Sequence, residues 1–333
     1  YYNVLGKSNT YVGAEAGLGV SGGNSNSSNV GVGTASMKGI TTGAYNTGIG
    51  EDALTSNTTA NHNTGVGANC LHNNTTGHSN VAVGSAALYY NTTASYNTAV
   101  GYTALQANTT GEQNVGIGRR ALINNTTGSY NTSCGTSALY SNTTGSNNIG
   151  CGYQALYANT SGANNTATGN NSLRYNTTGT YNTSAGEVSL YSNTTGQQNS
   201  AFGRSALYGN TTGSYNTGCG YAALGTNTTG ANNTGCGYQA LYYNTSGGNN
   251  TAVGFDALLH NTTGGENVAV GYRALRYNTT ADNNTAVGFE ALTSNTTGTN
   301  NTGLGLYTLK ANTTASYNVA AGRNALLDNT TGE

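Results

Sequence analysis

The sequence carries very little charge, and it contains neither proline nor tryptophan. Lys and Arg number 10 and Asp and Glu 11 among 333 residues, which gives a formal net charge of -1. A globular domain usually has about 25% charged residues, so the ordinary charged surface of an enzyme is missing. The near-zero net charge provides no electrostatic attraction for nucleic acid. No apolar run approaches the length of about 20 residues that a membrane-spanning helix needs. We therefore expect no nucleic-acid partner and no membrane span.

The composition also excludes collagen and charge-driven disorder. The 51 glycines follow no three-residue period, so the chain is not collagen-like. Disordered chains are typically rich in charge and proline, which are scarce or absent here. The chain is instead rich in Asn, Thr, Gly, Ala and Tyr, and these residues recur with a fixed period.

A repeat of 17 residues runs through most of the chain. Leu recurs at every seventeenth position from Leu54 to Leu326, and so does Gly from Gly50 to Gly322. One unit, residues 97–113, reads N-T-A-V-G-Y-T-A-L-Q-A-N-T-T-G-E-Q. No insertion or deletion interrupts the register, which indicates that each unit stacks on the next. The sequence predicts an all-β or mainly β solenoid of 17-residue coils, each with one short strand and a turn or short helical corner.

The N-terminal part departs from the repeat. Residues 29–33 are in register with the units that follow, but the first unit has Met37 where Leu belongs and Ile40 where Asn belongs. Residues 9–13 resemble the strand motif and lie 20 residues upstream, out of register. We expect an irregular cap or docking segment over residues 1–28 and the solenoid over residues 29–333.

Within one unit, two segments follow different patterns. The positions of Thr64 and Val66 are mostly β-branched in every unit, and only Gly, Ala or Ser stands between them. This pattern predicts a short strand whose small face lies against another layer. Gly67 and its equivalents should end the strand where φ is positive or another backbone approaches closely. The adjacent restricted residues Ala104 and Leu105 favour a single helical turn over a second strand.

Each unit also contains the triplet N-T-[ST], which is the acceptor pattern for N-glycosylation. If these sequons carry glycans, their Asn side chains point outward. The alternative is an internal ladder in which each amide bonds the same group one coil away. A second series, from Asn63 to Asn318, lacks sequons in most units and is predicted to be such a ladder only. The glycosylation candidates are Asn57, Asn74, Asn91, Asn108, Asn125, Asn142, Asn159, Asn176, Asn193, Asn210, Asn227, Asn244, Asn261, Asn278, Asn295, Asn312 and Asn329.

Four of the five cysteines occupy the third strand position of their units. Stacking would bring Cys134 near Cys151, and Cys219 near Cys236, within the Cα range of a disulfide. Inward side chains of parallel strands rarely have the Cβ geometry that a disulfide needs. We therefore interpret these four residues, and Cys70 at an Ala position, as small apolar core residues.

No catalytic, cofactor-binding or metal-binding group recurs from unit to unit. The four histidines fall at varying positions, the acidic residues are scattered, and no C-x-x-C motif is present. Calcium-binding solenoid repeats need Asp in their turns, where this chain has Asn and Thr. We expect no enzymatic activity, no cofactor and no metal.

Two surface patterns lead to further hypotheses. Thr58 and its equivalents would form a regular Thr array, as in an ice-binding solenoid, and thermal hysteresis would reveal that activity. The neighbouring Thr59, however, should not project on the same face. Tyr recurs at three positions of the unit, so we expect Tyr rows that stack from coil to coil, with packing on sugar rings as a further possibility.

Residues 97–105, N-T-A-V-G-Y-T-A-L, resemble the repeats of bacterial and phage tail-fibre-like proteins. They are also similar to the N-[ST]-x-A-[IV]-G motif in the head domains of trimeric autotransporter adhesins, which form a left-handed β-roll. Residues 250–258 repeat the motif with Phe255 in place of Tyr. The resemblance covers residues 29–333 and implies an extracellular, often trimeric fibre.

The function that these observations favour is structural. We expect a subunit of an extracellular filament or fibre at a cell or virion surface, coated with glycans if the sequons are occupied. The first alternative is an adhesin or tail-fibre shaft that binds a surface receptor, and the second is ice binding. The expected partners are copies of the chain itself, joined head to tail with residues 1–8 completing the last coil of a neighbour, or arranged as a trimer. A chain cut from a longer repeat array is the alternative to head-to-tail joining.

Overall fold

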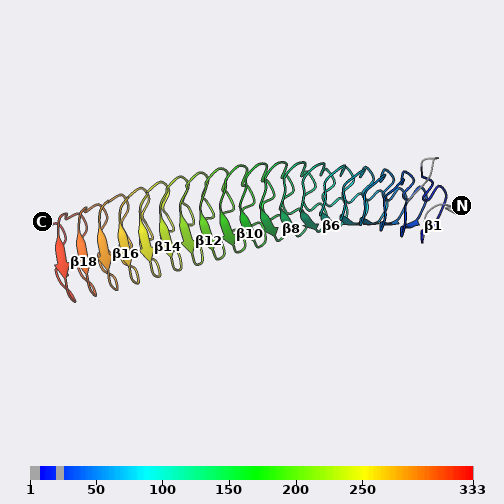
Figure 1. The fold of residues 1–333 in the computed structure, drawn as a ribbon. Coiled ribbons are helices and arrows are strands. Elements are labelled where there is room, and N and C mark those ends of the chain that lie inside the picture. The colour runs from blue at the N-terminus through cyan, green and yellow to red at the C-terminus, as the bar shows by residue number, and fades with distance from the viewer. Residues whose placement is uncertain (1–7, 20–25, 333) are drawn as a thin grey trace. The chain divides into compact units, whose positions relative to one another are not determined.

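The computed structural model describes residues 8–19 and 26–332. The chain divides into two compact units, Tyr1–Asn165 and Thr166–Glu333. Each unit is a parallel β-solenoid with one three-residue strand in each coil (Figure 1). Among the described residues there is no helix. The fold class predicted from the 17-residue repeat is therefore confirmed.

The strands of each unit pair in parallel with their neighbours one coil away. Thr98 is the register partner of Val115, so strand pairing follows the 17-residue period. In the first unit, the strands are β1 (Thr10–Val12), β2 (Val30–Val32), β3 (Thr47–Ile49), β4 (Thr64–Val66), β5 (Val81–Val83), β6 (Thr98–Val100), β7 (Val115–Ile117), β8 (Thr132–Cys134) and β9 (Ile149–Cys151). In the second unit, they are β10 (Thr166–Thr168), β11 (Thr183–Ala185), β12 (Ser200–Phe202), β13 (Thr217–Cys219), β14 (Thr234–Cys236), β15 (Thr251–Val253), β16 (Val268–Val270), β17 (Thr285–Val287), β18 (Thr302–Leu304) and β19 (Val319–Ala321).

The N-terminal segment contains a regular strand. In β1, Thr10 is the register partner of Val30 in β2, so the first coil has 20 residues rather than 17. The described part of the predicted cap is therefore not irregular at β1. In the first 17-residue unit, Met37 and Ile40 are fully buried, so this degenerate unit still contributes to the core.

Each strand presents its small central residue to the interior. A Cβ added to Gly116 would lie 3.2 Å from Cγ of Leu105, the core leucine of the preceding coil, so only a small residue fits there. The residues on either side face outward, and Val100, for example, is 37% exposed. The predicted small inner face is confirmed. The inward interpretation of the third strand position is wrong, because alternating side chains of a strand point to opposite faces.

The glycine that follows each strand is required for two physical reasons. Gly186 has a φ of 144°, which L-residues rarely adopt, and a Cβ there would lie 2.5 Å from the carbonyl oxygen of Gly203 in the next coil. Both conditions predicted for Gly67 and its equivalents are met, since Gly67 has a φ of 135° and approaches the Gly84 backbone.

The corner after this glycine is a turn and not the predicted helical turn. Thr103 and Leu105 have φ values of 54° and 52°, so left-handed residues alternate with right-handed ones. The Thr103 amide donates to Ser85 of the preceding coil, and the Leu105 amide donates to Ala121 of the following coil. The backbone thus bonds to both neighbouring coils instead of to itself. The hydrogen bonds between coils offset the cost of about 1–2 kcal/mol for each left-handed residue.

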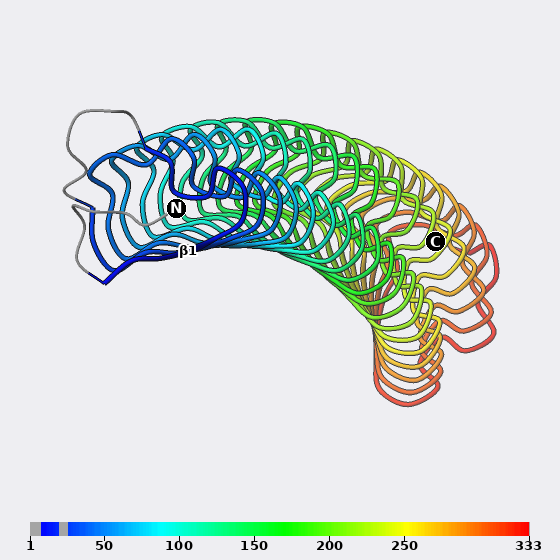
Figure 2. The same cartoon turned by 90° about the vertical axis from the view of Figure 1, so that its right-hand side faces the viewer.

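The apolar half of the core is a column of leucines flanked by alanines. Every leucine of the series is fully buried from Leu54 to Leu309, whereas Leu326 is 49% exposed. Within each unit, strand, corner and turn superpose from coil to coil (Figure 2). The predicted buried Leu column is therefore confirmed through Leu309.

Replacing a leucine in this column should destabilise the protein strongly. Leu190→Ala removes a fully buried side chain and leaves a cavity between coils, so we expect a loss of about 2–5 kcal/mol in urea unfolding. Val253→Thr is the matched control, because Val253 is 39% exposed and Thr168 occupies the same position in another coil. The control should change the unfolding free energy by less than about 0.5 kcal/mol. Equal effects of the two substitutions would contradict the burial of the Leu column.

Replacing the strand-end glycine should also be costly. In Gly186→Ala the new Cβ meets the next coil at a φ unfavourable for alanine, so we expect a loss of about 1–3 kcal/mol. Gly196→Ala is the control, since Ala60, Ala94 and Ala281 occupy its position in other coils and are buried there. Thermal unfolding of the two variants should show a loss for Gly186→Ala alone.

Candidate functional surfaces

The first asparagine series forms a ladder inside the solenoid. The amide nitrogen of Asn74 donates to Oδ1 of Asn57 one coil back at 3.0 Å, and to the carbonyl oxygen of Gly77 at 2.9 Å. The same two contacts recur at Asn210, with Asn193 and Gly213 as acceptors. This geometry confirms the internal ladder that was the alternative to glycosylation.

The second asparagine series forms another ladder beside the first. Oδ1 of Asn46 accepts from the backbone amide of Asn63 at 2.9 Å, and Nδ2 of Asn63 donates to Gly77 at 2.8 Å. Gly77 therefore accepts from both series, since Asn74 also donates to it. The two ladders are joined through this shared carbonyl, and the structural ladder predicted for the second series is confirmed.

The structure contradicts the outward orientation on which the glycosylation hypothesis depended. The candidates from Asn57 through Asn312 are all fully buried, and Asn329, in the last coil, is partly buried. A glycan attaches to Nδ2, the atom that donates the two ladder hydrogen bonds in the interior coils. Glycosylation of the folded interior coils would therefore break the ladder and force a bulky polar group into the core. The ladder accounts for the N-T-[ST] pattern without a glycan.

The threonine after each ladder asparagine is also engaged between coils. Oγ1 of Thr75 donates to the carbonyl oxygen of Thr92 at 3.1 Å, and the Thr75 amide donates to the same oxygen at 2.9 Å. Thr58 bonds Thr75 in the same way, at 3.3 Å for its hydroxyl. The Thr58 series therefore does not present a row of free hydroxyl groups, as binding to ice through that row would require.

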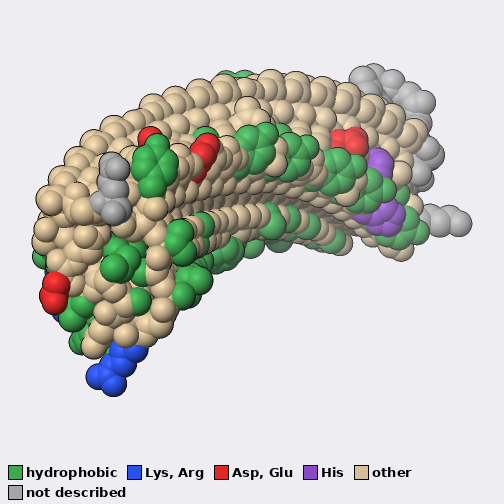
Figure 3. Space-filling view, turned by 90° about the vertical axis from the view of Figure 1, so that its left-hand side faces the viewer, with side chains coloured by type: hydrophobic (Ala, Val, Ile, Leu, Met, Phe, Trp, Pro, Cys, Tyr) green, Lys and Arg blue, Asp and Glu red, His purple; other side chains and the backbone are tan. Residues whose placement is uncertain are grey.

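Aromatic side chains form stacked rows on the outside of the coils. In the second unit, Tyr221, Tyr238, Phe255, Tyr272 and Phe289 stack consecutively, with ring centroids 4.8–5.4 Å apart. The predicted stacking from coil to coil is confirmed. Because rings inside a stack cover one another's faces, they present mainly edges outward, which disfavours the sugar packing that needs open faces. Figure 3 shows hydrophobic side chains arranged in such rows.

The histidines belong to these aromatic rows. His62 stacks on Tyr45 and His72 on Tyr89, while His78 makes an edge contact with Tyr96. His260 stacks between Tyr243 and Tyr277, with centroids 5.3 and 5.2 Å away. Burial lowers the pKa of His260, and the positive charge of Arg276 lowers it further, whereas Asp256 acts in the opposite direction. The four histidines lie apart and do not share a site.

A groove of about 650 Å³ runs beside the ring stack around His260. Tyr243, His260 and Tyr277 line one side, and Thr245, Thr262 and Thr279 are among the other lining residues. The hydroxyl groups of these threonines donate to carbonyl oxygens of the next coil. The groove is therefore mainly apolar, and nothing in its lining is arranged for catalysis.

Charged side chains form small, separate clusters. Asp256 is almost fully buried and pairs with Arg276 at 3.3 Å and with Arg273 at 3.7 Å. The two arginines lie over the rings of Tyr272 and Tyr277. These contacts neutralise the buried carboxylate, as a structural ion pair does.

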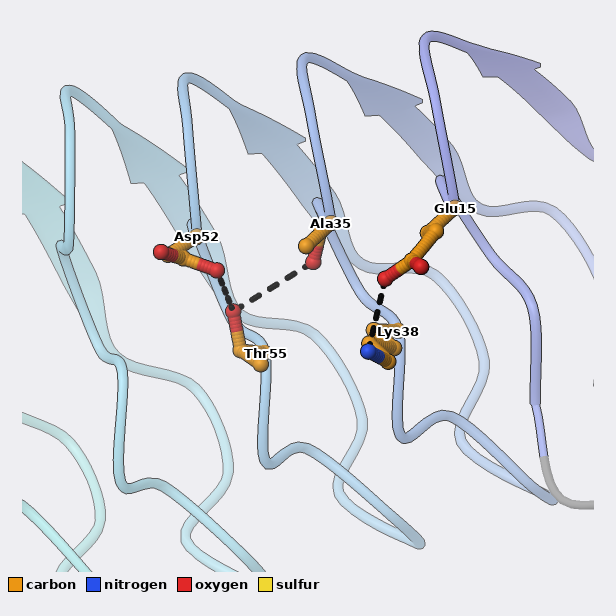
Figure 4. Close-up of polar contacts among 5 residues, drawn as sticks. All are labelled: Glu15, Ala35, Lys38, Asp52 and Thr55. Atoms are coloured by element: carbon orange, nitrogen blue, oxygen red, sulfur yellow. Dashed lines mark hydrogen bonds and ion pairs between the residues drawn. The ribbon is translucent and has the colours of Figure 1, made fainter.

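Near the N-terminus, Lys38 and Glu15 form an exposed ion pair of 2.6 Å (Figure 4). The hydrogen bond and charge of Glu15 raise the pKa of Lys38, and Asp52 raises it further. In the same view, the Thr55 hydroxyl lies 3.3 Å from the Ala35 carbonyl oxygen and 3.4 Å from Oδ1 of Asp52. Each of these contacts links neighbouring coils and joins no further titratable group into a site.

The cysteines divide into one buried residue and two outward pairs. Cys70 is fully buried, and burial raises the pKa of its thiol to about 12, so its interpretation as a core residue is confirmed. Cys134 and Cys219 are exposed, and Cys151 and Cys236 are partly exposed. The core interpretation of these four residues is wrong, because the third strand position faces outward. Burial raises the pKa of Cys151, and its neighbour Cys134 raises it further; Cys236 and Cys219 show the same relation.

No protein-family model, no curated protein and no solved structure matches this chain. The resemblance to tail-fibre and adhesin repeats therefore stays a prediction. Over residues 8–19 and 26–332, no helix has the length and apolar character needed to cross a membrane. Within the same ranges, no group of three or more His, Cys, Asp or Glu side chains is placed to hold a metal ion.

A charge introduced into the first ladder should be strongly destabilising. Asn193→Asp removes the two donors that bond Asn176 and Gly196 and places a carboxylate against these acceptors. We expect a loss of about 3–5 kcal/mol at pH 7 in urea unfolding. The loss should shrink as the pH falls toward about 4, because burial favours the neutral carboxyl, which can donate one hydrogen bond.

Asn232→Asp is the control for this experiment, because Asn232 is exposed. It should leave the stability nearly unchanged at both pH values. A small effect of Asn193→Asp at pH 7 would contradict the role of the ladder in stability.

Proposed function

We propose that this protein is a structural subunit of an extracellular filament or fibre. The observation that carries the proposal is the location of the residues that are identical in every repeat. The Leu, Gly, Asn and Thr of the unit act within the core or between coils, as Leu190, Gly186, Asn193 and Thr194 illustrate. The repeat therefore preserves the stacking of coils, which is the property that a fibre needs.

The exposed positions support the same proposal by their variety. The residue after the core leucine is Thr55, His72, Tyr89, Gln106 and Ile123 in successive coils. A repeated binding or catalytic site would require the same side chains at corresponding exposed positions. A structural shaft requires only that these side chains remain compatible with their neighbours one coil away, as the stacked ring rows are.

We further propose that copies associate head to tail through their coils. A parallel strand ladder can be extended by an equivalent strand from a second copy, as in β-strand addition. A contact of this heterologous kind continues as an open filament instead of closing into a dimer. The docking role was assigned to residues 1–8, of which residues 1–7 lie outside the described residues.

A second candidate function is the shaft of an adhesin or tail fibre. The observation that favours it is the apolar groove beside Tyr243, His260 and Tyr277, which is an exposed surface of a kind that contacts other molecules. In this case the protein would remain as separate or trimeric rods and would bind a receptor at a cell surface.

Electron cryomicroscopy of the purified full-length protein tests the two candidates. Filament formation predicts unbranched filaments whose diffraction has a reflection near 4.8 Å, the spacing between paired strands. Separate rods at all protein concentrations, with a constant mass in light scattering, would contradict the filament and favour the shaft. Antibody labelling of intact source cells or particles tests the extracellular location, and labelling only after permeabilisation would contradict it.

A variant lacking residues 1–8 tests head-to-tail docking separately. Fewer or shorter filaments are expected, with a melting temperature like that of the full chain. Filaments of unchanged length and abundance would refute the docking role while leaving the filament proposal intact.

A further inference from the structure

Four cysteines form two equivalent pairs on the outer face of the strands. Cys134 in β8 and Cys151 in β9 are direct register partners, and so are Cys219 in β13 and Cys236 in β14. All four occupy the third strand position, whose side chains point outward. Each unit therefore contains one pair of accessible thiols on adjacent parallel strands.

The geometry of parallel strands separates the two thiols of a pair by a defined distance. Neighbouring strands lie about 4.8 Å apart, and equivalent side chains leave two parallel strands in the same direction. A disulfide needs Cβ atoms about 3.8 Å apart, so a direct sulfur–sulfur bond would require adjacent coils to approach each other. The cysteines are free in the structure. A cation between two sulfur atoms needs such a separation and allows the strand pairing to remain.

We propose that each pair is a binding site for one soft d10 cation, of which Cu⁺ is the representative. Thiolates select soft cations, whereas Mg²⁺ and Ca²⁺ prefer oxygen ligands. A structural zinc site needs four protein ligands, and no group of three or more candidate ligands occurs within the described ranges. Two thiolates alone suit a cation that accepts linear two-coordinate binding.

The chemistry of the site is a simple exchange of protons for metal. Two thiols release two protons to solvent and bind one Cu⁺ through two sulfur–copper bonds, which gives a complex of net charge −1. No group changes its oxidation state, so neither an oxidant nor a reductant takes part.

The residues around the pairs provide no competing ligand. Ile117 pairs with Cys134, Phe202 with Cys219, and Val253 with Cys236 along the same outer column. These flanking side chains are apolar and about 40% exposed. A bound cation would therefore be confined to the two sulfur atoms of its own pair. This inference concerns the cysteine pairs alone and does not depend on the proposed function.

The repeat supplies substitutions that should leave the fold intact. Val occupies the third strand position in other coils, as at Val100, so Cys134→Val and Cys219→Val each remove one thiol without disturbing the strand. Cys70→Ala is the matched control, because Cys70 is buried and Ala53 and Ala87 occupy its position in neighbouring coils.

Anaerobic titration of the reduced full chain with Cu⁺, against a chromogenic Cu⁺ chelator, measures the binding. The wild-type protein and Cys70→Ala should each bind two equivalents. Cys134→Val should bind one, and Cys134→Val combined with Cys219→Val should bind none with comparable affinity. The loss of one thiol should weaken binding at its pair by about 10²–10⁴-fold, because the second ligand then no longer acts at a high effective concentration.

Two outcomes would overturn the proposal. The first is Cu⁺ binding by the wild type that is no stronger than binding by the double valine variant. The second is binding that depends on protein concentration and doubles the mass in light scattering, which would show that the cation bridges two chains. Circular dichroism of each variant checks that the solenoid is intact, so that loss of binding cannot be ascribed to unfolding.

Discussion

The hydrogen bond between buried asparagine side chains of successive coils is the constraint on which the structure depends. An amide in the interior needs partners, because a buried donor or acceptor without one costs about 1–3 kcal/mol. Asn193 finds its acceptor in Asn176, and Asn210 finds its acceptor in Asn193. Each coil must therefore place the same amide at the same height as the coil before it. A coil of a different length would break both ladders, which explains why the repeat tolerates no insertion.

The ladders also explain how a thin solenoid is stable with few large apolar residues. The core leucine and its neighbouring alanines fill one half of the interior, and the asparagines fill the other half with satisfied polar groups. Both halves contact the adjacent coils, so stability is a sum of interfaces between neighbours. The same interfaces hold residues such as Leu105 in left-handed backbone conformations that a single coil would not maintain.

This division of labour leaves the exposed positions free to differ from coil to coil. Tyr, His and Phe can replace one another in the stacked rows, because a flat ring of any of these types packs on its neighbour. The outer strand column holds Val, Ile, Cys, Thr and Phe without disturbing the ladder of strands. Functional chemistry on such a scaffold therefore arises where particular residues coincide in adjacent coils, as the cysteine pairs do.

The sequence alone was sufficient to establish the period, the stacking and much of the core. A fixed spacing of Leu, Gly and Asn can be produced only if equivalent residues meet equivalent neighbours, so the buried Leu column and the second asparagine ladder were predictable. The special conformation of the glycine at Gly67 followed from its presence in every unit, since no side chain is tolerated there.

The tertiary structure decided which way the side chains of the strand and of the first asparagine series point. A three-residue strand alternates between two faces, but its pattern does not say which face is inside when both are restricted; closure of the coil over Leu105 selects the small central residue and turns Cys134 outward. The letters N-T-T are the same in a glycosylation site and in a buried ladder, and only the position of Asn57 below Asn74 distinguishes them. The corner at Ala104 and Leu105 looked helical because adjacent side chains are both buried. Its true conformation depends on hydrogen bonds to the coils on either side, which no single repeat contains.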